Sequence, residues 1–528
     1  MRRHAPIVFI LAIAALARYW AIDFCLPSTL CRPDEEAVVA VATSFFNRHY
    51  NPHFFDWPSL FMYEVALGMV PLFKIGRWIG WYRSEAHYLQ MMVLDPTAVY
   101  LTARVLSAAA GTASVWVLYR IARRLYGETT ALVAALFLAL AFLHVRDSHF
   151  GVTDITATFL VLVSFLFVIR YWLLGSGREW LAAAFTAGLA TSTKYNAALI
   201  ALPLLWVVIT RRDARPLATR IGQAALVPAV MFLAFFMTSP FAVISYPELM
   251  KSLGEISSHL SQGHGVNLGR GWIVHLSSSL RYGLGIPLLA AGIIGLLLGI
   301  LGKPSTFAQC ASADKKGLRP RDGVMVAIFP ITYYLVIGSG YTTFARYILP
   351  VVPFLALGAA LIVSQVKRPA LMWAIALIII APSAWSVFQF DRLLARTDSR
   401  VLAENWVMEH YPNGALIGEI GRGSTKLHFV PPQPGVPSPY KSLAVDEDPG
   451  EPDILVVPIS LFDPTAQVSA PAMLLKQRYL PAHTVRAQDL AATGVVFDWQ
   501  DEFYLPLTGF AAIERPGPNY EIYVRPDP

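Results

Sequence analysis

Long hydrophobic stretches alternate with short polar segments over roughly the first 390 residues of the chain. A membrane-spanning helix needs about 20 mainly apolar residues, and short Lys- and Arg-rich segments between such stretches mark cytoplasmic loops. The pattern predicts an all-α membrane domain with about 11 transmembrane helices. The predicted spans are residues 6–22, 98–118, 130–143, 155–169, 180–191, 197–209, 221–238, 284–301, 323–337, 347–364 and 370–388.

The first span resembles a signal sequence, but no clear small-residue cleavage motif follows it, so we interpret it as a retained signal anchor. With the N-terminus inside, the residues after it lie on the extracytoplasmic face. The apolar segment 58–81 is interrupted by Glu64, Pro71 and Lys74, which predicts helices along the outer surface in the first exported loop. Residues 239–281 are expected to form a polar outer loop.

The character of the chain changes at Asp391. Residues 391–528 are rich in Pro, contain 18 acidic and 11 basic side chains, and include β-like runs at 453–457 and 520–524. This pattern predicts a transmembrane domain over residues 1–390 and a soluble α/β domain over residues 391–528. The excess of acidic over basic residues in the segment 391–528 suits a domain on the extracytoplasmic side.

Composition supports a polytopic membrane protein and argues against an ordinary soluble one. The chain is 55% hydrophobic and 15% charged, with a mean hydropathy of +0.50. Its formal charge of +7 does not indicate nucleic-acid binding, because the basic residues fall in short clusters between apolar stretches. The three cysteines match no zinc or redox spacing, although Cys25 and Cys31 can pair if their loop is exported.

Under this topology, ionisable residues gather at the outer ends of the spans. Carboxylates, a histidine and several cations at one membrane boundary suit a site that holds an anionic lipid headgroup and deprotonates an acceptor. The residues concerned are Asp34, Glu35, Glu36, Arg146, Asp147, His149, Asp154, Lys194, His259, His264, Arg270, His275 and Arg346.

Each acidic candidate has two interpretations. The run that begins with Asp34 provides a general base and a partner, or it is the first turn of a helix after Pro33, where acids face the helix dipole favourably. Asp154 follows Thr153 and is either a helix cap or a functional carboxylate. Five ionisable residues within segment 144–154 exceed what capping requires, which favours function there.

The basic candidates are open in the same way. Lys194 and Arg346 either bind a lipid phosphate or extend towards the headgroup region. His259, His264 and His275 lack an accompanying Glu or Cys ligand pattern, so a solvated loop is favoured over a metal site. We assign no metal ligand and expect no cofactor, while leaving a divalent metal open.

Several short motifs occur in an order that resembles a known family. They are the pair Asp34-Glu35, the aromatic stretch 56–63, His-x-Arg-x-Ser-His at 144–149, Thr-Lys-Tyr at 193–195 and Arg-Tyr-x-x-Pro at 346–350. This order is similar to that of the lipid-carrier-dependent glycosyltransferases of the GT-C superfold, which include protein O-mannosyltransferases and bacterial aminoarabinose transferases (ArnT-like). The resemblance covers about residues 1–390.

The resemblance implies transfer of a sugar, usually with inversion, from a polyprenyl-phosphate carrier to a lipid, glycan or protein acceptor on the outer face. It implies that Asp34 is the acceptor-activating base, Glu35 its neighbour in the pair and Asp154 the second acidic residue of the site. The substrate-binding candidates are Arg146, His149, Lys194 and Arg346 for the phosphate, and His264 from the outer loop. The expected location is the inner (plasma) membrane.

Two departures limit the substrate that the resemblance implies. Aminoarabinose-type members have Lys-Pro-Pro where this chain has Trp57-Pro58-Ser59, which argues against their substrate. The tail also lacks the carbohydrate-binding repeats of eukaryotic O-mannosyltransferases, which argues against a protein acceptor. The alternatives are a transporter or flippase of a lipid-linked saccharide, whose buried charges line a path, and a non-catalytic membrane scaffold.

Overall fold

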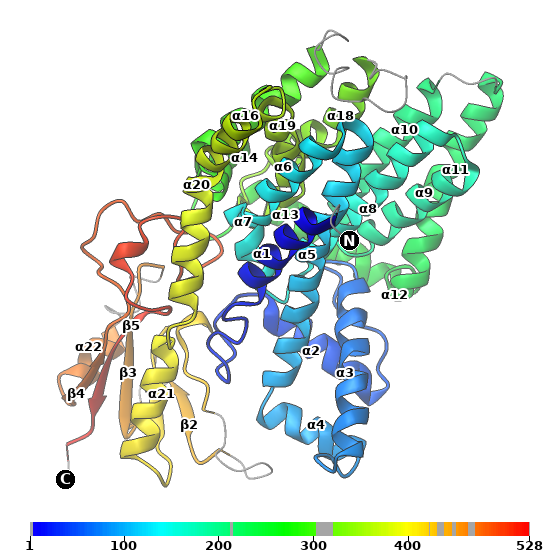
Figure 1. Ribbon diagram of the computed structural model, residues 1–528. Coiled ribbons are helices and arrows are strands. Elements are labelled where there is room, and N and C mark those ends of the chain that lie inside the picture. The colour runs from blue at the N-terminus through cyan, green and yellow to red at the C-terminus, as the bar shows by residue number, and fades with distance from the viewer. Residues whose placement is uncertain are drawn as a thin grey trace. The chain divides into compact units, whose positions relative to one another are not determined.

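The computed structural model describes residues 4–211, 215–301, 320–421, 423–429, 438–445, 450–462 and 470–526. The chain forms two compact units. The first contains residues 1–19, 44–66 and 103–388, and the second contains residues 20–43, 67–102 and 389–528 (Figure 1). The second unit thus combines two N-terminal segments with the C-terminal region.

The helices of the N-terminal third belong in part to each of the two units. They are α1 (Ala5–Tyr19), α2 (Glu35–Ser44), η2 (Phe45–Asn47), α3 (Leu60–Trp78), α4 (Glu85–Leu94), α5 (Thr97–Tyr126), α6 (Glu128–Ala139) and α7 (Phe142–Ser148).

Most helices of the first unit, the helical unit, come next in the chain. Its elements are α8 (Thr153–Leu174), α9 (Gly177–Thr191), η3 (Tyr195–Ile200), α10 (Ala201–Thr210), α11 (Leu217–Thr238), α12 (Pro240–Ile244), α13 (Tyr246–Gln262), α14 (Gly271–Val274), η4 (His275–Leu280), α15 (Arg281–Leu284), α16 (Ile286–Leu301), α18 (Pro320–Ile337), η6 (Ala345–Val351), α19 (Val352–Val363) and α20 (Pro369–Leu394).

Among the described residues, five helices are long and apolar enough to cross a membrane, or up to seven if each of two bent pairs is one span. Three shorter apolar helices accompany them. The total of about 11 spans therefore stays a prediction. The candidate span Pro369–His410 joins α20 to the next helix, and its apolar part is α20.

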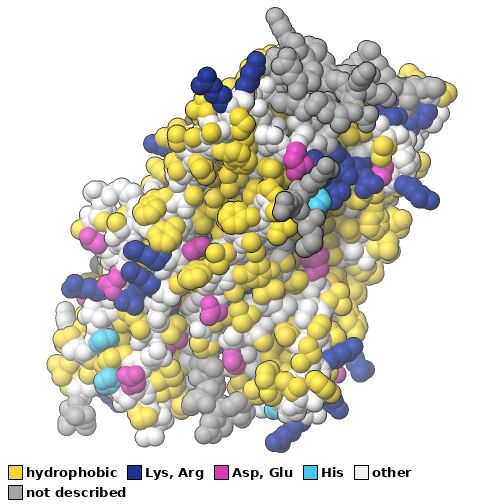
Figure 2. All heavy atoms as spheres, viewed as in Figure 1, with side chains coloured by type: hydrophobic (Ala, Val, Ile, Leu, Met, Phe, Trp, Pro, Cys, Tyr) yellow, Lys and Arg dark blue, Asp and Glu magenta, His cyan; other side chains and the backbone are white. Residues whose placement is uncertain are grey.

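Exposed apolar faces show which helices suit a lipid environment. A soluble protein rarely exposes large contiguous apolar patches. Hydrophobic side chains cover much of the helical region on the face shown in Figure 2. Exposed members on α11, α16 and α20 include Ile221, Leu226, Phe232, Leu233, Phe236, Ile294, Leu297, Leu298, Leu377, Ile378, Trp385 and Phe388.

Some helices approach so closely that only glycine fits between them. A Cβ atom at Gly295 of α16 would overlap the carbonyl oxygen of Gly358 of α19, and one at Gly292 would lie 2.7 Å from the carbonyl oxygen of Leu355. Small residues allow such contact between membrane helices, where dispersion and close packing replace the hydrophobic effect. The two helices therefore pack backbone to backbone.

The prediction of a polar outer loop at 239–281 is wrong in part. This segment forms the five-residue α12 and the 17-residue α13 before Gly263. α13 has Pro247 in its first turn, a position that suits proline, and alternates apolar and polar residues with helical spacing. Its low mean hydropathy hid the helix, because an amphipathic helix at a surface has few apolar residues overall.

The C-terminal region of the second unit is a small α/β domain. It contains α21 (Ser399–His410), β1 (Leu416–Glu419), η7 (Gly423–Thr425), β2 (Lys441–Ala444), β3 (Ile454–Ile459), α22 (Ala470–Lys476), β4 (Leu480–Val485), η9 (Phe510–Ala512) and β5 (Asn519–Val524).

The sheet has the order β2-β1-β3-β5-β4, with β1 parallel to β2 and β3, and β5 antiparallel to β3 and β4. Side chains alternate across it. Ile454 and Val456 pack with Ala403 and Val407 of α21 on one face, while β3 residues between them pack with Leu475 of α22 on the other. The predicted α/β tail and its two β-like runs are confirmed.

Candidate functional site

Asp154 lies in the first turn of α8 and is buried within the helical unit. Val152 is extended and α8 begins at Thr153, so Val152 and not Asp154 is the cap residue. A carboxylate in a first helical turn is favoured by the helix dipole. The side chain also makes two ion pairs, so local helix stabilisation does not account for all its contacts.

Lys194 provides the first of these ion pairs. The chain turns after α9, with the Lys194 N–H donating to the Ala190 carbonyl oxygen at 3.0 Å. The Lys194 ammonium then donates a hydrogen bond to Oδ1 of Asp154. Its Nζ also lies 4.6 Å from the ring centre of Tyr347, an arrangement that stabilises a cation. The local turn thus directs the Lys194 side chain towards the Asp154 carboxylate.

Arg346, from η6, provides the second ion pair. Its Nε lies 4.0 Å from Oδ2 of Asp154, and its guanidinium carbon lies 4.6 Å from the ring centre of Phe344. The side chains of Asp154, Lys194 and Arg346 are 5%, 16% and 6% exposed. Two cations around one carboxylate leave an excess of positive charge in a largely buried place, which favours an anionic ligand.

His264 lies beside this cluster, in the segment that follows α13. Its ring centre is 5.3 Å from that of Phe344, the residue over which Arg346 lies. Nδ1 of His264 lies 2.7 Å from Nε2 of His259. His264 is exposed. The structure therefore brings four of the predicted residues into one region: Asp154, Lys194, Arg346 and His264.

The aromatic stretch 56–63 packs against the turn before Lys194. The Leu60 N–H donates to the Ser192 carbonyl oxygen at 3.1 Å. The Tyr195 hydroxyl donates to the Phe55 carbonyl oxygen at 3.0 Å. This stretch thus reaches the neighbourhood of Lys194 although more than one hundred residues separate them.

Arg146 and His149 are buried at the end of α7. The chain bends by 57° between α6 and α7. Arg146 Nη1 donates to Oδ2 of Asp147 at 3.1 Å, and Nδ1 of His149 lies 3.0 Å from the Val145 carbonyl oxygen. Both side chains are fully buried. Their predicted role as phosphate ligands stays a prediction.

Asp34 and Glu35 belong to the second unit. Asp34 has a left-handed backbone (φ +74°), which Asp adopts more readily than most residues, and its carbonyl accepts from the Val38 N–H at 3.3 Å. Glu35 is the first residue of α2 and is 1% exposed. The helix N-terminus interpretation is therefore correct, and the role of Asp34 as a base stays a prediction.

The sequence alone does not single out Phe344 and Tyr347, the aromatic residues that face the two cations. Tyr347 is the residue after Arg346 in the Arg-Tyr-x-x-Pro motif, but an aromatic residue near a membrane surface is equally typical of an interfacial belt. Only the fold shows that its ring faces Lys194.

Part of the chain matches a known family model. Residues 96–244 match the family model described as dolichyl-phosphate-mannose-protein mannosyltransferase. This segment contains Arg146, His149, Asp154 and Lys194. No curated protein sequence is significantly similar to the chain.

Solved structures resemble the fold. ArnT from Cupriavidus metallidurans bound to undecaprenyl phosphate is 18% identical, with a TM-score of 0.50 over 77% of this chain and 73% of that one. The apo form of the same protein is 18% identical, with a TM-score of 0.51 over 78% and 73%. The Archaeoglobus fulgidus oligosaccharyltransferase is 12% identical, with a TM-score of 0.49 over 78% and 58%.

These similarities confirm the predicted resemblance and fold class. The chain has a GT-C fold of the ArnT type, made of a helical membrane domain and a small C-terminal sheet domain. The family match and the fold support the class of lipid-carrier-dependent glycosyltransferases.

Proposed function

We propose that this protein is an integral membrane glycosyltransferase that moves a sugar from a polyprenyl-phosphate carrier to an acceptor, with inversion. The observation that supports this most is the pairing of Asp154 with both Lys194 and Arg346 in a largely buried, net positive cluster. A sugar carried on a lipid phosphate leaves that phosphate with an additional negative charge. The two cations are suited to bind the donor and to stabilise this charge.

The chemistry requires one bond to form and one to break. The acceptor oxygen or nitrogen attacks the anomeric carbon, the bond between that carbon and the phosphate oxygen breaks, and its electron pair remains on the phosphate. A carboxylate takes the proton of the attacking group. We assign this base to Asp34, with Glu35 as its neighbour, on the sequence pattern.

Asp154 has a different role in this proposal. Its carboxylate accepts from Lys194 and pairs with Arg346, so it holds the two cations at fixed positions. Without the carboxylate, the two like charges would repel each other and turn apart. Arg146, His149 and His264 are further candidates for contacts to the donor.

We also propose that the site and the C-terminal domain lie on the extracytoplasmic face of the inner (plasma) membrane. A disulfide between Cys25 and Cys31 supports this side. The sequence allowed this pairing if the loop is exported, and disulfides persist mainly in oxidising compartments.

The test is transfer of radiolabel from a panel of polyprenyl-phosphate sugars to cell-envelope fractions. Membranes with the intact protein are compared with membranes that contain Asp154→Asn, and Glu255→Gln serves as the control. Glu255 is an exposed carboxylate of α13 whose side chain is 62% exposed and lies near Lys251. We expect label with the intact protein and the control, and a loss of about a hundredfold in Asp154→Asn.

The same membranes distinguish the transporter alternative. If the Asp154→Asn membranes transferred label as the intact ones do, while flipping of a lipid-linked sugar changed, the enzyme assignment would be wrong.

A further inference from the structure

The loop that precedes Asp34 is fixed by buried charges from the C-terminal domain, residues 389–528 of the same unit. Arg32 is fully buried and faces Asp501: Nη1 donates to Oδ1 at 3.0 Å, and Nη2 lies 2.8 Å from Oδ2. Its guanidinium carbon also lies 5.5 Å from the ring centre of Phe503. One hydrogen bond and one ion-pair contact thus join the guanidinium to the carboxylate.

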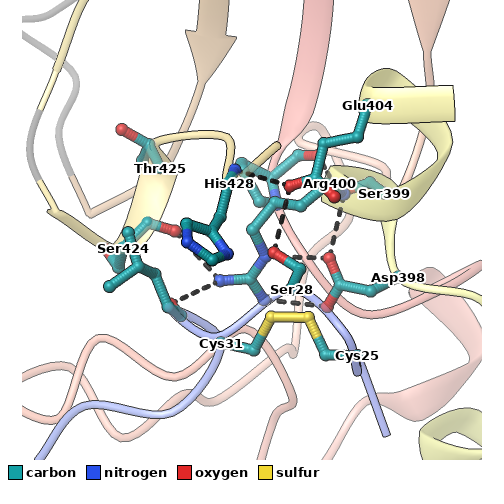
Figure 3. Close-up of a disulfide and its surroundings, with 12 residues drawn as sticks. Cys25, Ser28, Cys31, Asp398, Ser399, Arg400, Glu404, Ser424, Thr425 and His428 are labelled. Carbon is teal, nitrogen blue, oxygen red and sulfur yellow. Dashed lines mark hydrogen bonds and ion pairs between the residues drawn. A yellow bond between two sulfur atoms is a disulfide. The ribbon is translucent and has the colours of Figure 1, made fainter. Parts of the chain in front are cut away.

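A second arginine holds the backbone of the loop (Figure 3). Arg400 of α21 donates from Nε and Nη2 to the two carboxylate oxygens of Asp398, each at 2.8 Å. This pairing directs Nη1 to the Leu30 carbonyl oxygen at 3.0 Å, and Nη1 also reaches the Ser424 carbonyl oxygen at 3.0 Å. The loop is thus tied to α21 and to η7 through one guanidinium.

Two further contacts fix the loop that precedes Asp34. The Ser28 hydroxyl donates to Oε1 of Glu404 at 3.0 Å. The disulfide between Cys25 and Cys31 lies beside Asp398 in Figure 3, with the sulfur atoms and a carboxylate oxygen of Asp398 within 4.8 Å of one another. Residues on both sides of Leu30 are therefore fixed, and the last of them is Arg32.

Only Pro33 separates Arg32 from Asp34. Proline has a fixed φ angle, so the orientation set at Arg32 passes to Asp34 through a stiff link. Asp34 then adopts its left-handed backbone and directly precedes α2. A buried ion pair adds little net stability, because desolvation offsets the attraction, and fixing one conformation is its best supported use.

We propose that the C-terminal domain is a positioning element for the Asp34 carboxylate. Asp501, through Arg32, and Arg400, through the Leu30 carbonyl, hold the loop in the conformation that directs this carboxylate. The inference rests on the proposed function in one respect, which is the role of Asp34 as the base. Arg32, Arg400 and Asp501 act through the loop and are positioning residues.

The test uses the full-length protein in detergent or vesicles, with Arg32→Met, Asp501→Asn and the double variant. The control is Lys476→Met, which removes a half-exposed ion pair with Glu521 in the same domain. Hydrogen exchange of peptides from residues 20–43 reports the loop, and transfer kinetics report its consequence. Arg32→Lys keeps the charge but loses the planar fork, so it is expected to restore part of the rate.

We expect exchange in residues 20–43 to rise in both single variants and to stay unchanged in the control. We expect kcat to fall by about a hundredfold, as for a misplaced catalytic group, with the donor KM within about twofold of the intact value. If the substitutions instead unfolded the whole C-terminal domain, hydrogen exchange would rise throughout that domain, including β3. Such a result would overturn the proposal.

Two further results would also overturn the positioning role: loop exchange that stays at the intact level in Arg32→Met, or faster loop exchange with an intact kcat. If the intact protein transfers no sugar from any donor, the proposed function is wrong. The exchange measurement still decides whether the C-terminal domain fixes the loop.

Discussion

The ammonium group of Lys194 donates a hydrogen bond to the carboxylate of Asp154, 40 residues earlier in the chain. Arg346 pairs with the other oxygen of the same carboxylate. Three elements distant in sequence, α8, the turn after α9 and η6, thus meet at one carboxylate. We propose that this arrangement is functional, because ionisable side chains within a membrane domain are rare and costly to bury.

Asp34→Asn is expected to lower kcat by about a hundredfold, the scale of a lost general base, because Asn cannot accept the proton. The donor KM should stay near the intact value, since Asp34 is assigned no contact with the donor phosphate. Steady-state transfer kinetics with a saturating acceptor measure both constants. The control is Glu36→Gln, which neutralises an exposed neighbouring carboxylate. Equal losses of kcat in the two variants would refute the assignment of Asp34 as the base.

Glu404 should make the second unit's stability depend on pH. Burial, the largest cause, raises its pKa to about 8. The folded protein therefore binds a proton that the unfolded chain releases near pH 4.5, so the free energy of unfolding falls as pH rises through this range and levels off above about 8.

Glu404→Gln should remove this dependence. An amide oxygen can still accept from the Ser28 hydroxyl and the His428 N–H, and the amide does not titrate. Thermal unfolding midpoints between about pH 7 and pH 8 test this, because His428, whose pKa burial lowers, is then largely neutral in both states. A midpoint that falls equally with pH in the intact and variant proteins would contradict the prediction.

Gly295→Ala should destabilise the helical unit, because its Cβ would overlap the Gly358 carbonyl oxygen where α16 meets α19. The expected cost is about 1–3 kcal/mol, as for overpacking elsewhere. Thermal unfolding in detergent measures it. Gly222→Ala in α11 is the matched control, since no described neighbour lies within 4 Å of its added Cβ. A control as unstable as Gly295→Ala would show that helix packing is not the cause.

Loss of the Cys25–Cys31 disulfide should loosen the loop before Asp34. Cys25→Ser with Cys31→Ser frees a loop whose remaining links to the C-terminal domain are noncovalent. We expect a lower unfolding midpoint and faster proteolysis between residues 20 and 43. Cys310→Ser is the control, and cleavage that is unchanged in the double variant would contradict a structural role for the disulfide.

The sequence predicted the features that depend on local pattern. Apolar stretches predicted helices such as α8 and α11 within a few residues, and the two β-like runs predicted β3 and β5. Asp154 and Lys194 were identified because a charge beside an apolar span is unusual. The amphipathic α13 was missed, because its periodicity is spread over a segment of low overall hydropathy.

The pairing of residues across the chain was not predictable. Arg32 and Asp501 are 469 positions apart, and neither belongs to a recognisable motif. Their contact depends on the folded C-terminal domain, which no local pattern encodes. The same holds for Tyr347, which faces Lys194 only because η6 packs near the turn after α9.

The most direct test of the central claim is donor transfer by Lys194→Met and Arg346→Met, measured as kcat and donor KM in purified protein. Lys251→Met, whose side chain is 79% exposed on α13, controls for loss of a positive charge. If the two cations bind the carrier phosphate and stabilise its departure, each variant should lose kcat/KM by about a hundredfold while the control does not. Rates in both variants equal to that of Lys251→Met would contradict a phosphate site at Asp154.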